Sequence, residues 1–271
     1  MPELPEVETV RRGLSLHLID RCIRKVVVRQ RRLRCPIPRG LEQKIKGLCI
    51  KAIERRAKYL LIRCESGCLI CHLGMSGSLR ILDKTSAAGP HDHVDIYIDD
   101  SRMLRFCDPR KFGLILWTAK DPMQHKLLRD LGPEPLSTDF NGEYLYRISR
   151  GRKLAIKSFL MDSHIVVGVG NIYANEALFK AGVHPRRAAG RISLTRYESI
   201  AEAVRVTLKN AIKEGGTTLR NFVAEDGQPG YFKQALNVYQ RTGEPCPSCK
   251  TPIRLMRIGQ RSTFYCPRCQ H

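Results

Sequence analysis

Residues 92–107 read DHVDIYIDDSRMLRFC, and this stretch decides the fold class of the first half of the chain. Val94, Ile96 and Ile98 alternate with more polar neighbours, which is the period-two pattern of a half-buried β-strand. After an interruption rich in Asp, residues 103–107 form a second apolar run of strand length. The stretch therefore predicts two consecutive strands.

Short runs of the same kind recur on both sides of this stretch, separated by Gly, Pro or Asp. The predicted strands cover residues 25–29, 50–56, 60–64, 68–72, 79–82, 94–98, 103–107 and 114–117. Eight strands in roughly 100 residues predict a sandwich or a barrel. One helix is predicted before them, because Pro5 suits a first helical turn and Val7, Leu14 and Leu18 share one face.

The second half of the chain differs from the first in composition and in its predicted secondary structure. Pro and Asn residues between positions 132 and 151 predict a connector into a second domain. Two helices are predicted beyond it, one over about residues 170–181 and one that begins at an N-cap Ser193 and ends at Gly215. A helix pair with a compact turn is a common DNA-docking unit, although ordinary helical hairpins outnumber DNA-binding ones.

The 11 cysteines divide into two groups. Cys246, Cys249, Cys266 and Cys269 form C-x2-C-x16-C-x2-C, a spacing that closes a tetrahedral structural zinc site. The short segment between the two pairs favours a β-hairpin finger over a finger that carries a helix. The other seven cysteines lie in the first 107 residues without a repeating spacing, and we expect them to be reduced thiols of a cytosolic protein.

The charge of the chain points to a polyanionic partner. Lys and Arg number 47 against 26 Asp and Glu, so the formal net charge is +21. Neutralising phosphates releases counterions, which makes nucleic acid the leading partner; solubility alone and a membrane surface are the alternatives. With 42% hydrophobic residues the composition excludes a disordered chain. No apolar run approaches a membrane span and the acidic start is unlike a secretory signal, so we expect a cytosolic protein.

The N-terminal Pro2 and Glu3 are the first candidates for chemistry. Removal of the initiator Met exposes a secondary amine on Pro2, which can attack an aldehyde-like carbon and form an iminium. The alternative is that Pro2 is an ordinary second residue. Glu3 suits a general acid or base on a sugar, or equally a helix N-terminal charge.

Three internal motifs are further candidates. Lys58 follows two arginines just before an apolar strand, where it suits a phosphate contact, a proton donor or a solvated strand edge. Met75 lies in the glycine-rich turn HLGMSGS, an unusual place for a core-filling methionine. Arg110 and Phe112 in DPRKFG can fill the space of an expelled base and wedge a duplex open, or they form a polar turn with one core-facing Phe.

Six motifs in this order resemble the bacterial formamidopyrimidine-DNA glycosylases. They are MPELPEVET at the start, RRAKYL at 55–60, HLGMSG at 72–77, DPRKFG at 108–113, VGNIYA at 169–174 and the four-cysteine element with Gln260 and Arg261. The resemblance spans the whole chain. It implies a bifunctional repair enzyme that excises oxidised purines, chiefly 8-oxoguanine opposite cytosine and formamidopyrimidines, and then nicks the strand by β,δ-elimination.

The resemblance also implies roles for individual residues. Pro2 matches the Schiff-base nucleophile and Glu3 the proton donor at the sugar, while Lys58 and Arg261 match groups linked to β- and δ-elimination. The residues that match the filling and wedging triad are Met75, Arg110 and Phe112. The residues that match other DNA contacts are His72, His91, Arg152 and Asn171, and Arg110 matches one as well. One structural zinc, double-stranded DNA with oxidised bases or abasic sites as the partner, no membrane and a monomeric state are implied too.

The implied architecture is α+β and multidomain. Residues 1–132 are expected to form a catalytic β-sandwich domain with a leading helix. Residues 133–236 are expected to form a linker and a helix-two-turn-helix DNA-binding domain, with a lesion-recognition loop at 217–231. Residues 237–271 are expected to form the zinc β-hairpin finger.

Other functions remain open at this point. The related endonuclease VIII branch prefers oxidised pyrimidines, but Leu4 and the combination of Met75 with Arg110 and Phe112 favour the purine branch. A non-catalytic zinc-containing DNA-binding protein would explain the charge, the finger and the helix pair. An RNA-binding protein with a zinc ribbon is the third alternative.

Overall fold

The computed structural model describes residues 2–99, 101–215 and 236–271. The chain divides into two compact units, Met1–Arg129 with Glu214–Phe232 and Asp130–Lys213 with Lys233–His271. The predicted lesion-recognition loop at 217–231 lies outside the described residues. Within the described part of the chain, no helix has both the length and the apolar character needed to cross a membrane.

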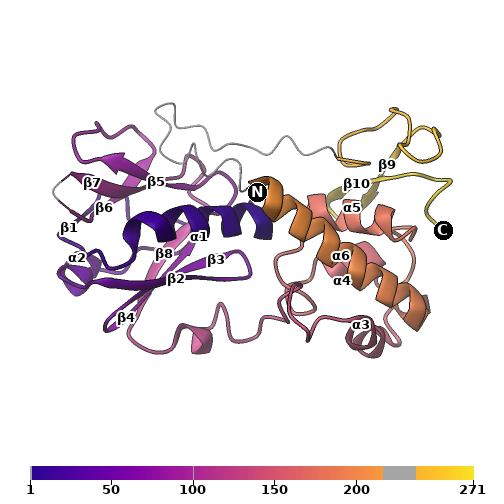
Figure 1. Cartoon of the computed structure of the whole chain (residues 1–271), viewed down its shortest axis with the longest axis horizontal. Coiled ribbons are helices and arrows are strands. Elements are labelled where there is room, and N and C mark those ends of the chain that lie inside the picture. Colours follow the sequence, from indigo (N-terminus) through magenta and orange to yellow (C-terminus); the bar gives the residue numbers. More distant parts are fainter. Residues whose placement is uncertain (1, 100, 216–235) are drawn as a thin grey trace. The chain divides into compact units, whose positions relative to one another are not determined.

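The first unit is built on two four-stranded antiparallel sheets, which confirms the predicted sandwich (Figure 1). One sheet has the strand order β1-β6-β7-β5 and the other the order β2-β3-β4-β8. The strands are β1 Lys25–Val28, β2 Ile50–Arg56, β3 Tyr59–Cys64, β4 Gly67–His72, β5 Ser78–Asp83, β6 Asp92–Tyr97, β7 Arg102–Cys107 and β8 Leu114–Thr118. Each predicted strand is present to within a few residues, because alternating burial is a local property of the sequence.

Helix α1 (Leu4–Leu18) contacts strands of both sheets and buries the apolar face predicted for it. Glu8 binds Arg55 at 3.2 Å, and Arg11 donates to the carbonyl of Ile53 at 3.4 Å. The residue numbers of the helix rise as those of β2 fall, so α1 runs antiparallel to β2 (Figure 1). The N-terminal end of α1 therefore lies at the end of β2 that leads into β3. A short helix α2 (Leu41–Ile45) was not predicted.

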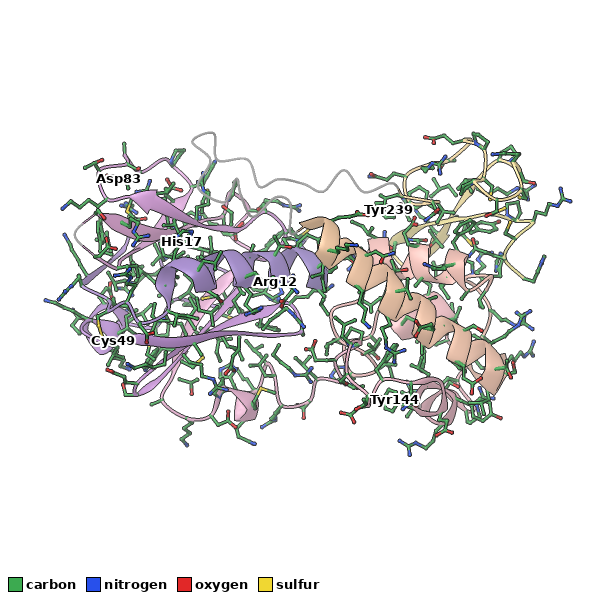
Figure 2. All side chains as sticks on the ribbon, in the orientation of Figure 1. Arg12, His17, Cys49, Asp83, Tyr144 and Tyr239 are labelled. Carbon is green, nitrogen blue, oxygen red and sulfur yellow. A yellow bond between two sulfur atoms is a disulfide. The ribbon has the colours of Figure 1, made fainter. Side chains whose placement is uncertain are left out.

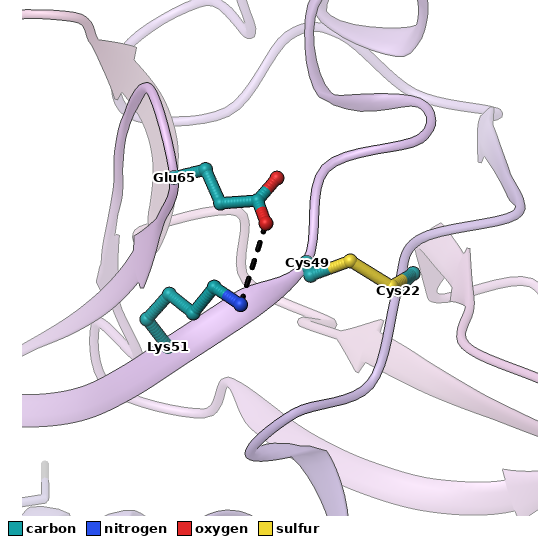
Figure 3. Close-up of a disulfide and its surroundings, with 4 residues drawn as sticks. All are labelled: Cys22, Cys49, Lys51 and Glu65. Atoms are coloured by element: carbon teal, nitrogen blue, oxygen red, sulfur yellow. Dashed lines mark ion pairs between the residues drawn. A yellow bond between two sulfur atoms is a disulfide. The ribbon is translucent and has the colours of Figure 1, made fainter.

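A disulfide joins Cys22 to Cys49, which corrects the expectation that all seven N-terminal cysteines are reduced (Figure 3). The segment after α1 pairs with the residues before β2 as an isolated antiparallel bridge, and the two Cα atoms lie 3.8 Å apart. The partners are 27 positions apart in sequence, so only the tertiary pairing brings them together. Cys64, Cys68 and Cys71 are free and buried, as expected.

The second unit contains the two predicted helices, α5 (Asn171–Lys180) and α6 (Leu194–Gly215). It also contains α3 (Gly142–Ser149), so the last part of the predicted connector at 132–151 is a helix, and α4 (Ile156–Leu160), which was not predicted. The Asn141 side chain caps α3 by accepting from the Tyr144 N–H at 2.9 Å. The prolines before it concealed this eight-residue helix, whose buried face is set by tertiary packing. Short 3-10 turns occupy Pro122–Gln124 in the first unit and Ala189–Arg191 in the second.

The four-cysteine element is a β-hairpin of β9 (Arg254–Ile258) and β10 (Arg261–Tyr265), as predicted. Polar groups buried in the helices hold it within the second unit. The Glu176 carboxylate of α5 accepts from the backbone N–H groups of Asn237, Val238 and Tyr239 at 2.9 Å each. The ring of Tyr239, which is labelled in Figure 2, in turn meets Phe264 edge-on, and the ring centroids are 5.0 Å apart. The finger is therefore continuous with the helical core.

Candidate active site and nucleic-acid interface

The candidate residues of the first unit lie on turns at one end of the sandwich. In one sheet Tyr59 pairs with His72, and His72 pairs with Leu114. In the other sheet Cys107 pairs with both Ser78 and Asp92. This register brings together the β2–β3 turn, the β4–β5 turn, the β7–β8 loop and the residues before β6. Distant motifs of the sequence are neighbours for this reason.

Pro2 and Glu3 lie at the same end of the sandwich, because α1 is antiparallel to β2. Glu3 is buried, with 3% of its surface exposed, and Pro2 is half-buried. The Glu3 backbone N–H donates to the Glu6 carboxylate at 2.8 Å. This bond fixes the backbone immediately after the candidate nucleophile.

Lys58 belongs to a two-residue turn between the paired residues Arg56 and Tyr59. Ala57 has a left-handed backbone with φ of 56°, which is unusual for a residue other than Gly. Arg55 donates to the Ala57 carbonyl at 3.0 Å and also binds Glu8 of α1. The same arginine thus fixes both the lysine turn and the first turns of α1.

Glu8 is the acidic centre of this contact between α1 and β2. Burial raises its pKa, but hydrogen bonds from Arg11 and Arg12 and the charge of Arg55 outweigh burial and hold the pKa below its usual value. The carboxylate is therefore ionised at neutral pH. It anchors the N-terminal half of α1 to β2.

His72 is buried at the end of β4, with its ring centroid 4.8 Å from that of Tyr59. Burial, together with the positive charges of Arg34 and Lys58, lowers the pKa of His72 to about 4, so the ring is neutral at pH 7. Its Nδ1 accepts the Gly74 N–H at 2.9 Å, which places the proton of the neutral ring on Nε2. A neutral Nε2–H is suited to donate to a phosphate oxygen.

Met75 and Phe112 are exposed apolar side chains, with 39% and 45% of their surfaces accessible. The Arg110 guanidinium lies 4.9 Å from the centroid of the Phe112 ring. Phe112 is therefore not a core residue. The turns that carry Met75, Arg110 and Phe112 are neighbours, since a Cβ on Gly74 would lie 2.5 Å from the Phe112 carbonyl carbon. His91, which is exposed, joins this group through its carbonyl, which accepts from the Asp108 N–H at 3.0 Å.

In the second unit the structure brings Asn171 beside Arg261 but ties Arg152 to other residues. The Asn171 side chain donates to the Ser262 carbonyl at 3.1 Å, and the exposed Arg261 immediately precedes Ser262 at the start of β10. Arg152 is exposed too, but its Nε donates to the Ile148 carbonyl at 2.9 Å and its guanidinium lies over Phe159, 5.6 Å from the ring centroid. These contacts link Arg152 to α3 and α4.

Cys246, Cys249, Cys266 and Cys269 form the structural zinc site that their spacing predicted, with all four sulfur atoms within 4.8 Å of one another. The sulfurs of Cys249 and Cys266 are 3.4 Å apart and those of Cys246 and Cys269 are 3.9 Å apart. Tetrahedral zinc with Zn–S bonds of about 2.3 Å needs sulfurs about 3.8 Å apart, so the cage fits one zinc ion.

Without a metal the thiols of the cage titrate differently from one another. A hydrogen bond from Thr251 lowers the pKa of Cys249 to about 6, whereas burial and neighbouring thiols raise the pKa of Cys266 and of Cys269. Four thiolates repel one another unless a cation compensates their charge. Zinc supplies that charge and stabilises the hairpin.

Sequence reasoning assigned no role to three buried charged residues of these regions. Asp108 stands in a motif that was noted only for Arg110 and Phe112. Lys157 is 1% exposed and donates to the Ser262 carbonyl and to the Thr263 hydroxyl, both at 2.8 Å. Glu176 binds the chain that enters the finger. The sequence feature that could have indicated Lys157 and Glu176 is a charged residue among mostly apolar neighbours in the sequence.

The sandwich, the helical unit and the four-cysteine hairpin are the three parts of the structure that known protein families match. Three family models match the chain in order. They are the formamidopyrimidine-DNA glycosylase N-terminal domain at residues 1–115, the formamidopyrimidine-DNA glycosylase H2TH domain at 131–223 and the zinc finger found in FPG and IleRS at 243–271. The chain belongs to the formamidopyrimidine-DNA glycosylase family.

Individual relatives are similar over the full length. The chain is 56% identical over 271 residues to the formamidopyrimidine-DNA glycosylase of Nitrosococcus oceani and 58% identical over 270 residues to that of Stutzerimonas stutzeri, with 100% of each protein covered. The crystal structure of the Lactococcus lactis FPG with Fapy-dG containing DNA superposes with a TM-score of 0.89 at 31% identity, covering 99% of both chains. A structure of MutM in complex with carbocyclic 8-oxo-G containing DNA gives 0.89 at 32% identity, covering 100% of both chains.

Proposed function

We propose that this protein is a bifunctional DNA glycosylase and abasic-site lyase that removes oxidised purines, 8-oxoguanine opposite cytosine and formamidopyrimidines. The observation that carries the proposal is that Pro2, Glu3 and Lys58 lie at the same end of the sandwich as the exposed Met75, Arg110 and Phe112. An enzyme that acts on a base inside DNA must take that base out of the stack, which a wedge assists, and a nucleophilic amine allows the same enzyme to form the covalent intermediate needed for strand cleavage.

The chemistry begins at C1′ of the damaged nucleotide. The neutral amine of Pro2 attacks C1′ and the bond to the base breaks, and the proton of the resulting ammonium goes to the departing base. The carboxylic acid of Glu3 then gives its proton to the ring oxygen O4′, and the bond from C1′ to O4′ breaks as the nitrogen lone pair forms the iminium. The free enzyme amine is restored when water hydrolyses the final iminium.

Strand cleavage uses the iminium as an electron sink. Loss of a proton from C2′ expels the 3′ phosphate, and loss of a proton from C4′ then expels the 5′ phosphate. We assign Lys58 to the first elimination and Arg261 to the second, as proton carriers or phosphate contacts. Arg261 starts β10 and is exposed, as that role requires.

DNA binding follows from charge and from the exposed turns. The +21 net charge favours a phosphate backbone, and the solved relatives include complexes with DNA that contains an abasic site, Fapy-dG or carbocyclic 8-oxo-G. The assigned phosphate and backbone contacts are His72, His91, Arg110, Arg152 and Asn171. Met75, Arg110 and Phe112 fill the space of the flipped nucleotide and open the stack.

The proposal includes the division of labour along the chain. Residues 1–132 carry the catalysis, residues 133–236 form the linker and the DNA-binding helices with a lesion-recognition loop at 217–231, and residues 237–271 form the finger. The enzyme acts as a monomer on chromosomal DNA in the bacterial cytoplasm.

Borohydride trapping tests the proposal. The protein without its initiator Met is mixed with a duplex that carries 8-oxoguanine opposite cytosine, and dihydrouracil and undamaged duplexes are run in parallel. A covalent complex that maps to Pro2 and favours the 8-oxoguanine duplex is expected. The variant Pro2→Gly should lose most of the complex, and the control Pro5→Ala, which retains the N-terminal amine, should keep it.

The other outcomes select the alternatives. A complex that favours dihydrouracil keeps the chemistry but moves the substrate to oxidised pyrimidines. Tight DNA binding without any complex identifies a non-catalytic DNA-binding protein. Preferential binding of double-stranded RNA at matched salt identifies an RNA-binding protein.

A further inference from the structure

The turns that carry Met75 and Phe112 are in direct backbone contact. Gly74 has φ of +64°, and a Cβ placed on it would lie 2.5 Å from both the Phe112 carbonyl carbon and the Gly113 nitrogen. A Cβ on Gly113 would lie 2.7 Å from the His72 carbonyl oxygen. Only glycine permits this approach at both positions, so the two turns dock as one surface.

The Asp108 carboxylate bridges these two turns. It is fully buried, and its Oδ1 accepts the Ser76 hydroxyl at 2.7 Å while its Oδ2 accepts the Gly113 N–H at 2.7 Å. Ser76 lies beside Met75, and Gly113 lies beside Phe112. The Ser76 oxygen also accepts the Arg110 N–H at 3.2 Å, so one carboxylate supports the backbone beside all three exposed side chains.

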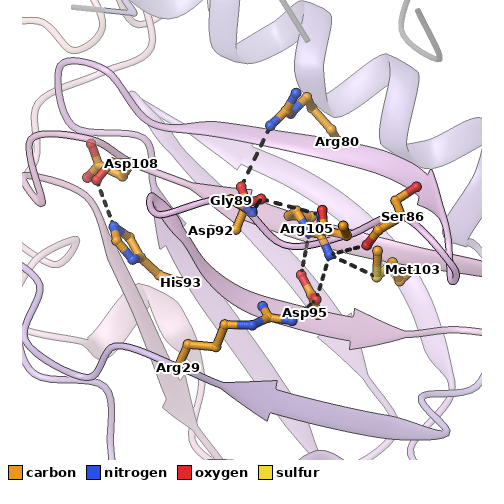
Figure 4. A network of polar contacts seen from close by, with 11 residues as sticks. Arg29, Arg80, Ser86, Gly89, Asp92, His93, Asp95, Met103, Arg105 and Asp108 are labelled. Carbon is orange, nitrogen blue, oxygen red and sulfur yellow. Dashed lines mark hydrogen bonds and ion pairs between the residues drawn. The ribbon is translucent and has the colours of Figure 1, made fainter. Parts of the chain in front are cut away.

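The main chain of Asp108 holds a third segment. Its N–H donates to the His91 carbonyl at 3.0 Å, and its carbonyl lies 2.7 Å from Nε2 of the buried His93 (Figure 4). The carbonyl also accepts the Lys111 N–H at 3.2 Å, which stabilises the left-handed Lys111, whose φ is 56°. Asp108 therefore lies at the junction of the turns that carry Met75, Phe112 and His91.

The His91 segment is fixed from its other side by a separate buried cluster (Figure 4). Arg105 donates to the carbonyls of Ser86 and Ala87 at 3.0 and 2.7 Å and pairs with the fully buried Asp95 at 2.8 Å. Gly89 N–H donates to Asp92 at 2.8 Å. The segment that reaches Asp108 is therefore itself held in place.

We propose that Asp108 is the positioning residue that sets the relative placement of the Met75 turn and the Arg110–Phe112 turn, so that both enter the duplex together. The inference rests on the proposed function, since it concerns the wedge assigned there. Asp108 acts through the turns and not on the substrate, because both carboxylate oxygens receive protein donors. Base flipping depends on this geometry, and a misplacement of about 1 Å in a reacting assembly can cost on the order of 100-fold in rate.

The test uses Asp108→Asn with Asp99→Asn as the matched control. Asn offers one acceptor where Asp offers two. Either the Gly113 bond is lost, or the amide nitrogen of Asn donates to the Ser76 oxygen, where it competes with the Arg110 N–H that this oxygen already accepts. Asp99 also holds a turn, by accepting the Ser101 and Arg102 N–H groups at 2.9 and 2.7 Å, but it follows the pair of Tyr97 with Met103 at the opposite end of the sheet. Ser76→Ala, which removes only the hydroxyl, is a milder second variant if Asp108→Asn folds poorly.

Two readouts separate positioning from general stability. A 2-aminopurine base beside the 8-oxoguanine fluoresces when the wedge unstacks it, and borohydride trapping on a preformed abasic site reports the amine without excision of a base. We expect Asp108→Asn to lose the fluorescence rise and to slow excision of 8-oxoguanine about ten-fold or more, with Ser76→Ala changed in the same direction. Trapping on the abasic duplex should stay equal to that of Asp99→Asn.

Phe112→Ala makes the outcomes distinguishable. If Phe112→Ala loses the fluorescence rise while Asp108→Asn and Ser76→Ala keep it, the positioning role is overturned and the proposed wedge stands. If Asp108→Asn loses trapping and fluorescence in equal measure, its role is general folding and the inference is overturned. If Phe112→Ala changes nothing, the proposed wedge itself fails and the inference fails with it.

Discussion

Single residues show how burial sets the chemical state of a group in this protein. His72 and Glu8 lie near the same end of β2 and β3, yet burial dominates in His72, whose pKa falls, while three arginines overcome burial in Glu8, whose pKa also falls. The first group is neutral at pH 7 and the second is charged. Neither state was predicted from the sequence, because both depend on neighbours that only the fold supplies.

The depressed pKa of His72 predicts a specific pH dependence of stability. The folded pKa of about 4 lies below the ordinary value of 6.5, so the unfolded state binds more protons between these values. Stability should therefore fall as the pH drops from 6.5 towards 4, by about 3 kcal/mol in total from this group. The substitution His72→Asn, which keeps an acceptor for the Gly74 N–H, should flatten that dependence in urea unfolding at pH 7 and pH 4.5. The exposed control is His91→Asn. If the free energy of unfolding changes equally with pH in the wild type and in His72→Asn, the assignment is contradicted.

At the level of strands and helices, the sandwich was predictable and its connections were not. The strands alternate apolar and polar residues, and this alternation can be read from the local sequence alone. Helices α2 and α3 are short, and their buried positions are fixed by what they pack against, so their local sequences resemble loops. The pairing of Cys22 with Cys49 depends on contacts across the fold for the same reason.

The candidate site was predictable as a set of motifs but not as an arrangement. Each motif carries a residue type suited to one step of the proposed chemistry. Their meeting depends on strand register, such as the pairs from Tyr59 to His72 and from His72 to Leu114, which no single motif reveals. Asp108 was missed because its burial and its hydrogen bonds with Ser76 and Gly113 depend on the fold and cannot be recognised in the sequence.

The zinc hairpin should lose its metal and its fold together. Cys249→Ser removes one of four thiolate ligands, and the contacts of the hairpin with α4 and α5 do not replace the metal that joins its two cysteine pairs. We expect zinc content to fall well below one per chain and hydrogen exchange in β9 and β10 to accelerate. Cys35→Ser, at a half-buried free cysteine outside the cage, is the matched control. Full zinc stoichiometry in Cys249→Ser would refute the ligand assignment.

Lys157 should control how firmly β10 is held on α4. Lys157→Met leaves the Ser262 carbonyl and the Thr263 hydroxyl without this donor, at a cost of about 1–3 kcal/mol. Hydrogen exchange at residues 261–265 should accelerate, while the exposed control Lys153→Met should leave it unchanged. Identical exchange in both variants would show that other contacts hold the strand.

For the molecule as a whole, charge decides how binding responds to salt. Because the chain carries +21, the affinity for a lesion duplex should fall steeply with salt concentration. Arg261→Ala should reduce the slope of log affinity against log salt by about one if Arg261 contacts a phosphate. Lys120→Ala, beyond the end of β8 that pairs with Cys68, is exposed at the other end of the sandwich and should not change the slope. An unaltered slope for Arg261→Ala would remove it from the interface.

The buried amine of Lys157 has a practical consequence for following the whole protein in solution. Acylating reagents modify lysines at rates set by solvent access, so Lys157, at 1% exposure, should be among the last amines to react. Its labelling requires the hairpin to leave α4, even briefly. The rate of Lys157 acylation, measured by mass spectrometry of the peptides, would then report how often the finger separates from α4 in the wild-type protein, with no engineered probe.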